Sequence, residues 1–207
     1  EGHDFKVKTL HALKTSSAPN FFFAVDDIIV TGSVDVTACG RWLDTFNAFG
    51  FYLRLGKHIT HCYSLNIETG IPPLQGVREG VLRWRFDEGK GDWGFPASVD
   101  MTVWRKSDIM PLLDRYYFDN PTKLESILES LPKNRFGLCF ESAKMVNLPL
   151  NLVNKTAPGN RYMAAITAYE LLEKFEQGYT FDTRPLALIV PQAPHMEYMP
   201  PFIKRPL

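Results

Sequence analysis

Several features that mark specialised classes of protein are missing from this sequence. Its 207 residues carry 23 basic and 23 acidic side chains, so no net charge is available to attract nucleic acid or an anionic membrane surface. The three cysteines, Cys39, Cys62 and Cys139, are too few and too scattered for a disulfide framework. Internal repeats and low-complexity tracts are absent as well. The sequence therefore favours neither a nucleic-acid partner nor a disulfide-stapled secreted domain.

Long hydrophobic segments are also absent. The apolar stretch from Phe21 to Val30 is interrupted by Asp26 and Asp27, whereas a membrane-spanning helix needs about 20 apolar residues. The first residues are polar and lack the apolar centre of a signal peptide. We therefore expect no membrane span and a reducing, cytoplasmic location.

The sequence does contain ample material for a buried core. Hydrophobic residues make up 45% of the chain and aromatic residues 13%, which excludes a disordered chain. Segments with apolar residues at helical spacing alternate with short apolar runs, a pattern typical of an α/β domain. The expected helices cover residues 4–14, 33–48 (capped by Ser33 or Asp35), 107–113, 120–131 and 162–177. The expected strands cover residues 21–25, 51–55, 62–66, 81–86, 101–105, 137–140 and 144–148.

One pair of acidic residues follows a continuous apolar run. We expect residues 21–25 to be a strand buried on both faces of a central sheet, and this run ends in Asp26 and Asp27. Adjacent charges at the end of a buried strand are costly unless a cation or strong donors offset them. Open α/β sheets bind ligands at this edge, and carboxylate oxygens suit Mg²⁺ or Mn²⁺. The hypothesis is a divalent-cation site, and the alternative is a solvated loop.

The order of these segments resembles the middle of a GT-A glycosyltransferase, a class within the nucleotide-diphospho-sugar transferase superfamily. A helix is followed by an apolar strand and then by Asp26 and Asp27, where that family has an acidic motif that holds a sugar nucleotide through a divalent metal. Residues 98–109 resemble the strand and helix that carry acceptor-side residues. Residues 120–125 resemble the helix start at which inverting members have their catalytic base.

This resemblance departs from the family in two respects. The first acid of the usual motif falls at Ala24, and the N-terminal nucleotide-binding half of the family has no counterpart here. We therefore expect a GT-A-like mixed sheet flanked by helices, as a partial domain over residues 1–183. The proline-rich residues 184–207 are expected to form a tail that wraps the surface.

The resemblance gives roles to further residues. Glu125 would be the catalytic base that deprotonates the acceptor hydroxyl, with Asp100 as the second choice. Glu125 lies a few positions past Asn120, so we expect it in the first turn of a helix, where the helix dipole would lower its pKa. The alternative is an ordinary first-turn glutamate.

A glycine-rich loop offers a second kind of substrate contact. Trp93 stands between glycines with Asp92 beside it, and an aromatic face with an adjacent carboxylate suits the C–H groups and hydroxyls of a sugar. The interpretation is that Asp92 and Trp93 position the acceptor. The alternative is a loop whose tryptophan fills the core.

The function expected from the resemblance is metal-dependent transfer of a glycosyl group from a sugar nucleotide to a hydroxyl acceptor. In this hypothesis Asp26 and Asp27 bind Mn²⁺ or Mg²⁺, and Asp26 also contacts the substrate. The acceptor is a sugar, a lipid or a protein. The competing hypothesis is a non-catalytic carbohydrate-binding or interaction module on a degenerate GT-A scaffold.

Overall fold

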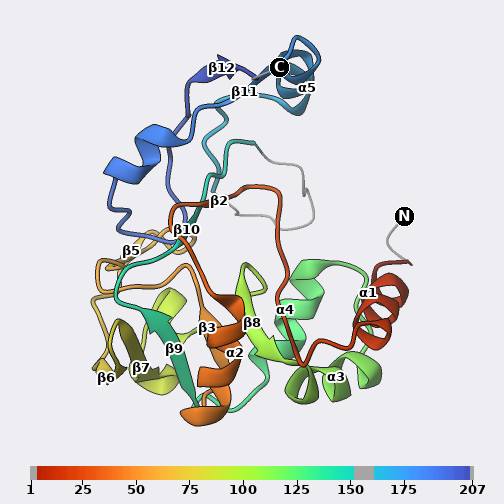
Figure 1. The fold of residues 1–207 in the computed structure, drawn as a ribbon, viewed down its shortest axis with the longest axis vertical. Helices are drawn as coiled ribbons and strands as arrows, with labels where there is room; N and C mark the ends of the chain where they lie inside the picture. Colours follow the sequence, from red (N-terminus) through yellow and green to blue (C-terminus); the bar gives the residue numbers. More distant parts are fainter. Residues whose placement is uncertain (1–3, 152–160, 206–207) are drawn as a thin grey trace.

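The computed structural model describes residues 4–151 and 161–205 and shows a mixed α/β fold. Its main sheet has the strand order β1-β8-β3-β9-β7-β6 (Figure 1). β3 and β9 run parallel, and the other neighbouring strands of this sheet run antiparallel. The predicted α/β class is therefore confirmed. The strands of the sheet are β1 (Asn20–Phe21), β3 (Gly50–Tyr52), β6 (Gln75–Arg78), β7 (Val81–Arg85), β8 (Thr102–Arg105) and β9 (Phe136–Phe140).

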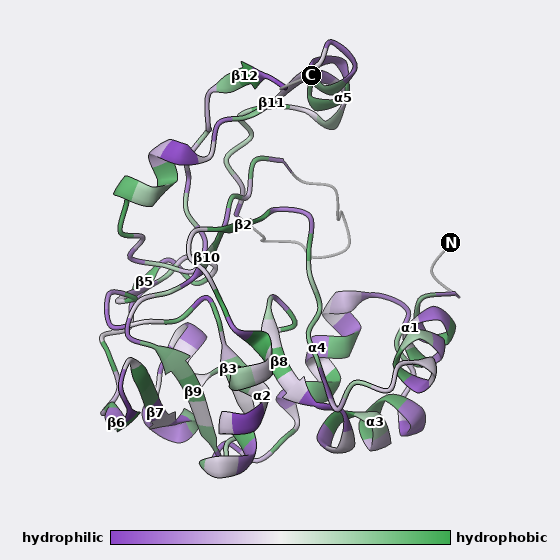
Figure 2. Ribbon diagram, viewed as in Figure 1, coloured by the Kyte–Doolittle hydropathy of each residue, from purple (hydrophilic) through white to green (hydrophobic). Residues whose placement is uncertain are grey.

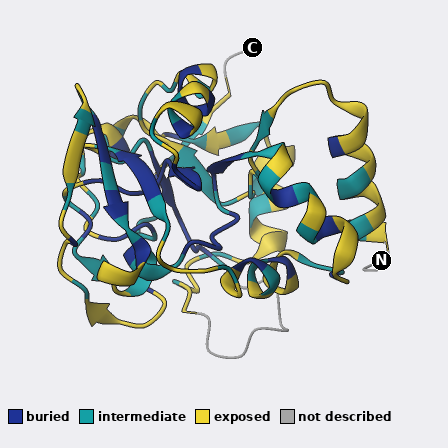
Figure 3. Ribbon diagram, turned by 90° about the horizontal axis from the view of Figure 1, so that it is seen from below, coloured by how far each residue is buried: buried dark blue, intermediate teal, exposed yellow. Residues whose placement is uncertain are grey.

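Helices cover both faces of this sheet. Successive residues of a strand point to opposite faces, so each strand contributes side chains to two hydrophobic cores. Tyr52 and Trp104 pack in one core cluster with residues of α1, α3 and α4, whereas Phe51 and Val103 pack in another with α2. Figure 3 shows buried residues along the central strands and exposed residues on the outer turns of the helices. The helices are α1 (Asp4–Thr15), α2 (Val36–Thr45), α3 (Lys106–Arg115), α4 (Pro121–Glu129) and α5 (Ala168–Glu176).

Two helices begin where the sequence predicts a cap. The Asp35 side chain accepts a hydrogen bond from the Ala38 N–H at the start of α2. Asn120 accepts one from the Lys123 N–H at the start of α4, and Pro121 occupies the first helical position. These caps fix the starts of α2 and α4 relative to the sheet.

The prediction that residues 21–25 form a central strand is wrong. Only β1 forms there, at the edge of the sheet, and Phe23 adds a single bridge to Asp100. Phe21 and Phe23 pack against Trp104, while Phe22 is exposed. This alternation is that of a segment with one buried face rather than two.

Other predicted elements differ from the structure in extent. β6 lies outside the expected strands, and it pairs with β7. The segments at 137–140 and 144–148 are two strands in different sheets: β9 lies in the main sheet, and β10 (Met145–Asn147) pairs with β2 (Ile28–Val30). The expected helix at 162–177 begins only at Ala168, where Thr167 and Glu170 form a capping box.

The C-terminal segment lies mostly beyond one end of the sheet. α5, β11 (Tyr179–Phe181) and β12 (Phe202–Lys204) form a small group there (Figure 1), and hydrophobic residues occur on β12 and on the short helix η3 (Arg184–Leu188) (Figure 2). Within the expected tail 184–207, residues 206–207 lie outside the described residues. A third strand pair joins β4 (His61–Cys62) and β5 (Ile67–Glu68).

None of the helices in the described residues has the length and apolar character needed to cross a bilayer. The remaining described elements are the short 3-10 helices η1 (Phe86–Glu88) and η2 (Gly91–Gly94), which precede β8.

Candidate functional site

A cavity of about 420 Å³, here called the central cavity, brings together residues from distant parts of the chain. Its lining includes four carboxylates that the sequence analysis selected, and each comes from a separate part of the fold. They are Asp27 before β2, Asp92 in η2, Asp100 before β8 and Glu125 in α4. Arg54, Ser98 and His195 complete its polar centre. The structure thus brings together four of the predicted site residues.

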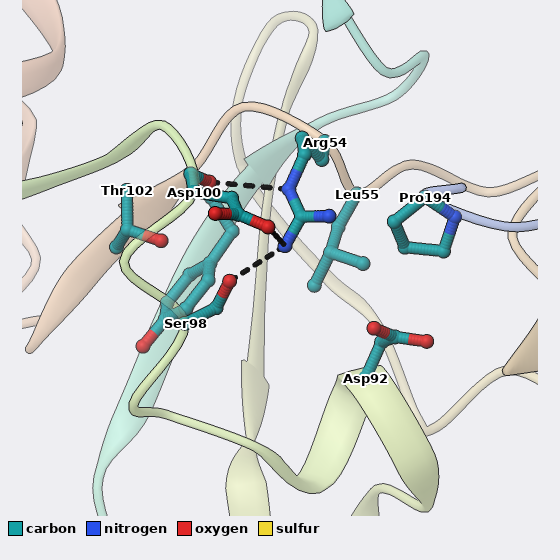
Figure 4. A pocket seen from close by; sticks show the side chains of 8 residues that line it. Arg54, Leu55, Asp92, Ser98, Asp100, Thr102 and Pro194 are labelled. Atoms are coloured by element: carbon teal, nitrogen blue, oxygen red, sulfur yellow. Dashed lines mark hydrogen bonds and ion pairs between the residues drawn. The ribbon is translucent and has the colours of Figure 1, made fainter. Parts of the chain in front are cut away.

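Arg54 organises the base of this cavity. Its side chain is buried, with 6% of the residue exposed, and it lies two residues after the end of β3. The guanidinium donates through Nε to the Asp100 carbonyl at 3.1 Å and through Nη2 to Ser98 Oγ at 2.6 Å, and Nη2 also lies 3.3 Å from Asp100 Oδ2 (Figure 4). Nη1 donates to Asn147 Oδ1 at 2.7 Å. A buried guanidinium needs such partners, because an unpaired charge in the interior is costly.

Asn147 links this cation to two carboxylates. Its amide oxygen accepts from Arg54, and its Nδ2 donates to Asp27 Oδ1 at 3.0 Å and to Asp100 Oδ2 at 3.4 Å. The backbone fixes this position, because Asn147 pairs with Ile28 in the β2–β10 ladder. The residue after Asn147 holds the Asp27 carbonyl through a backbone hydrogen bond of 2.9 Å. Asp27, Asp100 and Asn147 therefore meet at one amide group.

Asp100 precedes a sharp bend in the backbone. Met101 has φ of 54°, in the left-handed region that non-glycine residues rarely adopt. Its N–H donates to the Phe23 carbonyl, and its carbonyl accepts from Leu53, next to Arg54. The bend is thus fixed on both sides, and it sets Asp100 against Arg54.

Asp27 and Asp26 lie in different surroundings, although they are adjacent in a turn. Burial raises the pKa of Asp27, the nearby Asp100 raises it further, and the Asn147 hydrogen bond lowers it. Asp26 is exposed and does not line the central cavity. Both residues line a smaller, more apolar cavity of about 170 Å³ beside β2 and α5. Asp26 and Asp27, which were expected to form one site, therefore lie in different surroundings. Asp27 lies beside Asp100 in the central cavity, and Asp26 does not.

Glu125 faces the central cavity, but not for the reason expected. It lies in the second turn of α4, not the first, so the helix dipole does not lower its pKa. Burial instead raises its pKa to about 7, and Asp100 adds to this, while the Val99 N–H, which donates to Oε1 at 3.0 Å, lowers it. A carboxyl group with a pKa near neutrality can accept and release a proton at physiological pH.

The two residues predicted to contact the acceptor from the glycine-rich loop, Asp92 and Trp93, lie in different surroundings. Trp93 is fully buried, and its indole N–H donates to the Ile59 carbonyl at 2.9 Å, so it fills the core as the alternative interpretation states. Asp92 instead lines the central cavity, and burial raises its pKa. Figure 4 shows its carboxylate across from Arg54, where a space of about 10 Å³ has room for a single water molecule.

His195 comes from the expected tail and was not anticipated. It forms a parallel bridge with Asn147, and its ring stacks on Tyr63 at 5.7 Å. Burial, together with the charge of Arg54, lowers the pKa of His195 to about 4, so the imidazole is neutral at pH 7. Its Nδ1 is buried and has no hydrogen-bond partner within residues 4–151 and 161–205.

The residues missed from the sequence left weak signals. Arg54 interrupts the apolar run from Phe51 to Leu55, and a lone charge in such a run is buried only with partners. His195 lies between Pro194 and Met196, again among apolar neighbours. Neither signal shows which carboxylates lie near Arg54 or His195 in the folded protein.

Comparisons with known proteins bear on this site only distantly. No protein-family model matches the chain, and no solved structure matches it. The chain is similar to a Dictyostelium discoideum protein described as bifunctional glycosyltransferase pgtA, with 28% identity over 116 residues. The match takes in 50% of this chain and 15% of that protein, so the chain spans only a small part of its relative. This similarity supports a distant glycosyltransferase relationship.

Replacement of Glu125 by glutamine should remove a pH-dependent loss of stability. Because folding raises the pKa of Glu125 from 4.5 to about 7, the folded protein binds this proton more tightly than the unfolded chain does. The contribution of the protonated Glu125 to the free energy of unfolding is full below pH 4.5 and is lost as the pH rises towards 7. The free energy of unfolding can be measured with urea at about pH 5 and at about pH 8. Between these two pH values the wild type should lose up to about 3 kcal/mol more of it than Glu125→Gln does.

The matched control is Glu173→Gln, at an exposed position on α5 that does not line the central cavity. This variant should show the same difference in the free energy of unfolding between the two pH values as the wild type. An identical pH dependence in the wild type and in Glu125→Gln would contradict the environment assigned to Glu125.

Proposed function

We propose that this chain transfers a glycosyl group from a sugar nucleotide to a hydroxyl acceptor at the central cavity. The observation that carries the proposal is the convergence of Asp27, Asp92, Asp100 and Glu125 on one cavity that includes a carboxyl group with a pKa of about 7. The distant similarity to a glycosyltransferase supports the same class of reaction.

Glu125 is the proposed general base. Its hydrogen bond to Val99 uses Oε1 and fixes the carboxylate, which leaves Oε2 to accept a proton. The acceptor oxygen forms a bond to the anomeric carbon as its proton passes to Glu125, and the bond from that carbon to the donor phosphate oxygen breaks. The nucleoside diphosphate leaves with that electron pair. Asp100 is less suited to this role, because it is paired with Arg54 and Asn147.

The oxygen donors of the cavity suit a divalent cation. Asp27 and Asp100 share the Asn147 amide, and burial together with mutual repulsion raises the pKa of Asp27, which indicates uncompensated negative charge. The described residues hold no cluster of three or more ligating side chains. Mg²⁺ commonly takes only one or two carboxylates and completes its shell with water and substrate phosphates. Asp27 and Asp100 would hold such an ion, which would offset the charge on the leaving diphosphate.

The positive charges in the cavity have separate tasks in this proposal. Arg54 is buried and bonded to protein groups, so it positions carboxylates rather than binding substrate. Arg161 lies at the wall, where its guanidinium stacks over Tyr63 at 4.5 Å and pairs with Glu197 at 3.7 Å. Neither guanidinium is free to neutralise a diphosphate by itself, which supports the need for a cation.

Glu125→Gln should abolish transfer without weakening donor binding. Because glutamine cannot take the proton, we expect kcat to fall by about 10²- to 10⁴-fold while the donor KM changes little. Donor turnover with water as acceptor can be followed by release of nucleoside diphosphate from a panel of uridine and guanosine diphosphate sugars with Mn²⁺. The wild-type rate should rise with pH through about 7 as Glu125 ionises.

Glu173→Gln, on the exposed surface of α5, is the control and should keep the wild-type rate. A fully active Glu125→Gln enzyme would remove the base assignment. Turnover of none of these donors would instead favour the non-catalytic carbohydrate-binding module.

Asp27→Asn should weaken binding of Mn²⁺ far more than Asp26→Asn does. The two positions are adjacent, but only Asp27 reaches the amide shared with Asp100. Calorimetry with Mn²⁺ should show binding by the wild type and by Asp26→Asn, and a loss of at least about tenfold for Asp27→Asn. Equal affinities for all three proteins would contradict the cation site.

A further inference from the structure

A second cavity adjoins the central one. This outer cavity has the same volume, about 420 Å³, and the two share Ser64, Asp92 and Phe95 as lining residues. Each volume alone is within the range of a small-molecule site. The shared residues place the two cavities side by side.

Helix α4 contributes residues to both cavities. Glu125 lines the central cavity and Glu129 lines the outer one, and the two lie four residues apart, so they share one face of the helix. Their separation along the helix axis is about 6 Å at 1.5 Å per residue. Lys133, just beyond the end of α4, lines the outer cavity as well.

The chemistry of the shared wall suits a saccharide. Phe95 is half-buried and packs on the core with part of its ring, so an aromatic surface lies at the junction. Asp92 Oδ2 is buried and has no hydrogen-bond partner in the part of the chain that the structure describes. A ligand hydroxyl can donate to such an oxygen.

The charge of the outer cavity argues against a diphosphate there. Its lining carries Asp92 and Glu129 against the single cation Lys133. An anionic donor would therefore be repelled from this end, whereas a neutral polyhydroxyl chain would not. Gly91 packs closely against β4, because a Cβ at this position would come within 2.6 Å of Cys62 Cβ.

We propose that the acceptor is a saccharide of at least two units that lies across both cavities. The terminal unit lies in the central cavity with its reacting hydroxyl at Glu125, and the preceding unit lies in the outer cavity between Phe95 and Glu129. This inference rests on the proposed glycosyl transfer and adds the acceptor class and the residues that select it.

The test is retention of the intact chain on a printed glycan array that carries each monosaccharide beside the di- and trisaccharides that end in it. We expect binding to glycans of two or more units to be at least about tenfold stronger than binding to the matching monosaccharide. Glu129→Gln and Lys133→Ala, both at exposed positions, should reduce this preference, and Phe95→Leu should reduce it further. Glu173→Gln on α5 should leave it unchanged.

Equal binding of monosaccharides and longer glycans, or retention of no glycan, would overturn the two-unit acceptor. Donor turnover with water needs no acceptor, so these failures can be told apart from a failure of the transferase proposal. Turnover without a preference for length keeps the transferase and removes the outer subsite. A preference for length without turnover keeps the two-unit groove and removes the transfer reaction.

Discussion

The buried guanidinium of Arg54 is the constraint on which the site depends. It follows a fully buried strand, so its charge is stabilised only if protein groups surround it. Those groups are the Asp100 carboxylate and carbonyl, the Ser98 hydroxyl and the Asn147 amide. Because Asn147 then has only its Nδ2 to offer, that nitrogen draws in Asp27 as well. A single cation thus orders side chains from three separate segments.

An excess of negative charge follows from this arrangement. Arg54 pairs with Asp100 and reaches Asp27 only through Asn147. Burial raises the pKa of Asp27, and the nearby Asp100 raises it further. Glu125 is buried near Asp100, and its pKa rises to about 7. His195, beside the same guanidinium, stays neutral. The site therefore combines a group that can carry a proton at neutral pH with carboxylate oxygens whose negative charge is only partly compensated.

Much of the fold could be predicted from the sequence, because apolar spacing and caps are local signals. Asp35 and Asn120 mark the starts of α2 and α4, and the strand near residue 103 alternates as expected. The position of residues 21–25 could not be predicted, since three consecutive phenylalanines look the same at a sheet edge as at its centre. Only packing against Trp104 decides which of them face inward.

The acidic members of the candidate site were predictable, but Arg54, His195 and the pairing of the acids were not. Four of the selected acids share the central cavity, yet the partner of Asp27 is Asp100, about seventy positions away, and not its neighbour Asp26. Trp93 fills the core, whereas Phe95 lies at the wall. Such distinctions depend on which residues of one loop turn inward, and composition gives no information about that. The tail likewise returns to the cavity with His195 through contacts with β10.

The most direct test of this account is a double-mutant cycle at Arg54 and Asp100, measured by urea unfolding. Arg54→Met alone should cost about 3–5 kcal/mol, because it leaves the Asp100 carboxylate without its buried cation. Adding Asp100→Asn should recover at least about 1 kcal/mol of that loss, as expected for residues in direct contact. If the two substitutions are additive, or if Arg54→Met is nearly neutral, Arg54 does not organise the site.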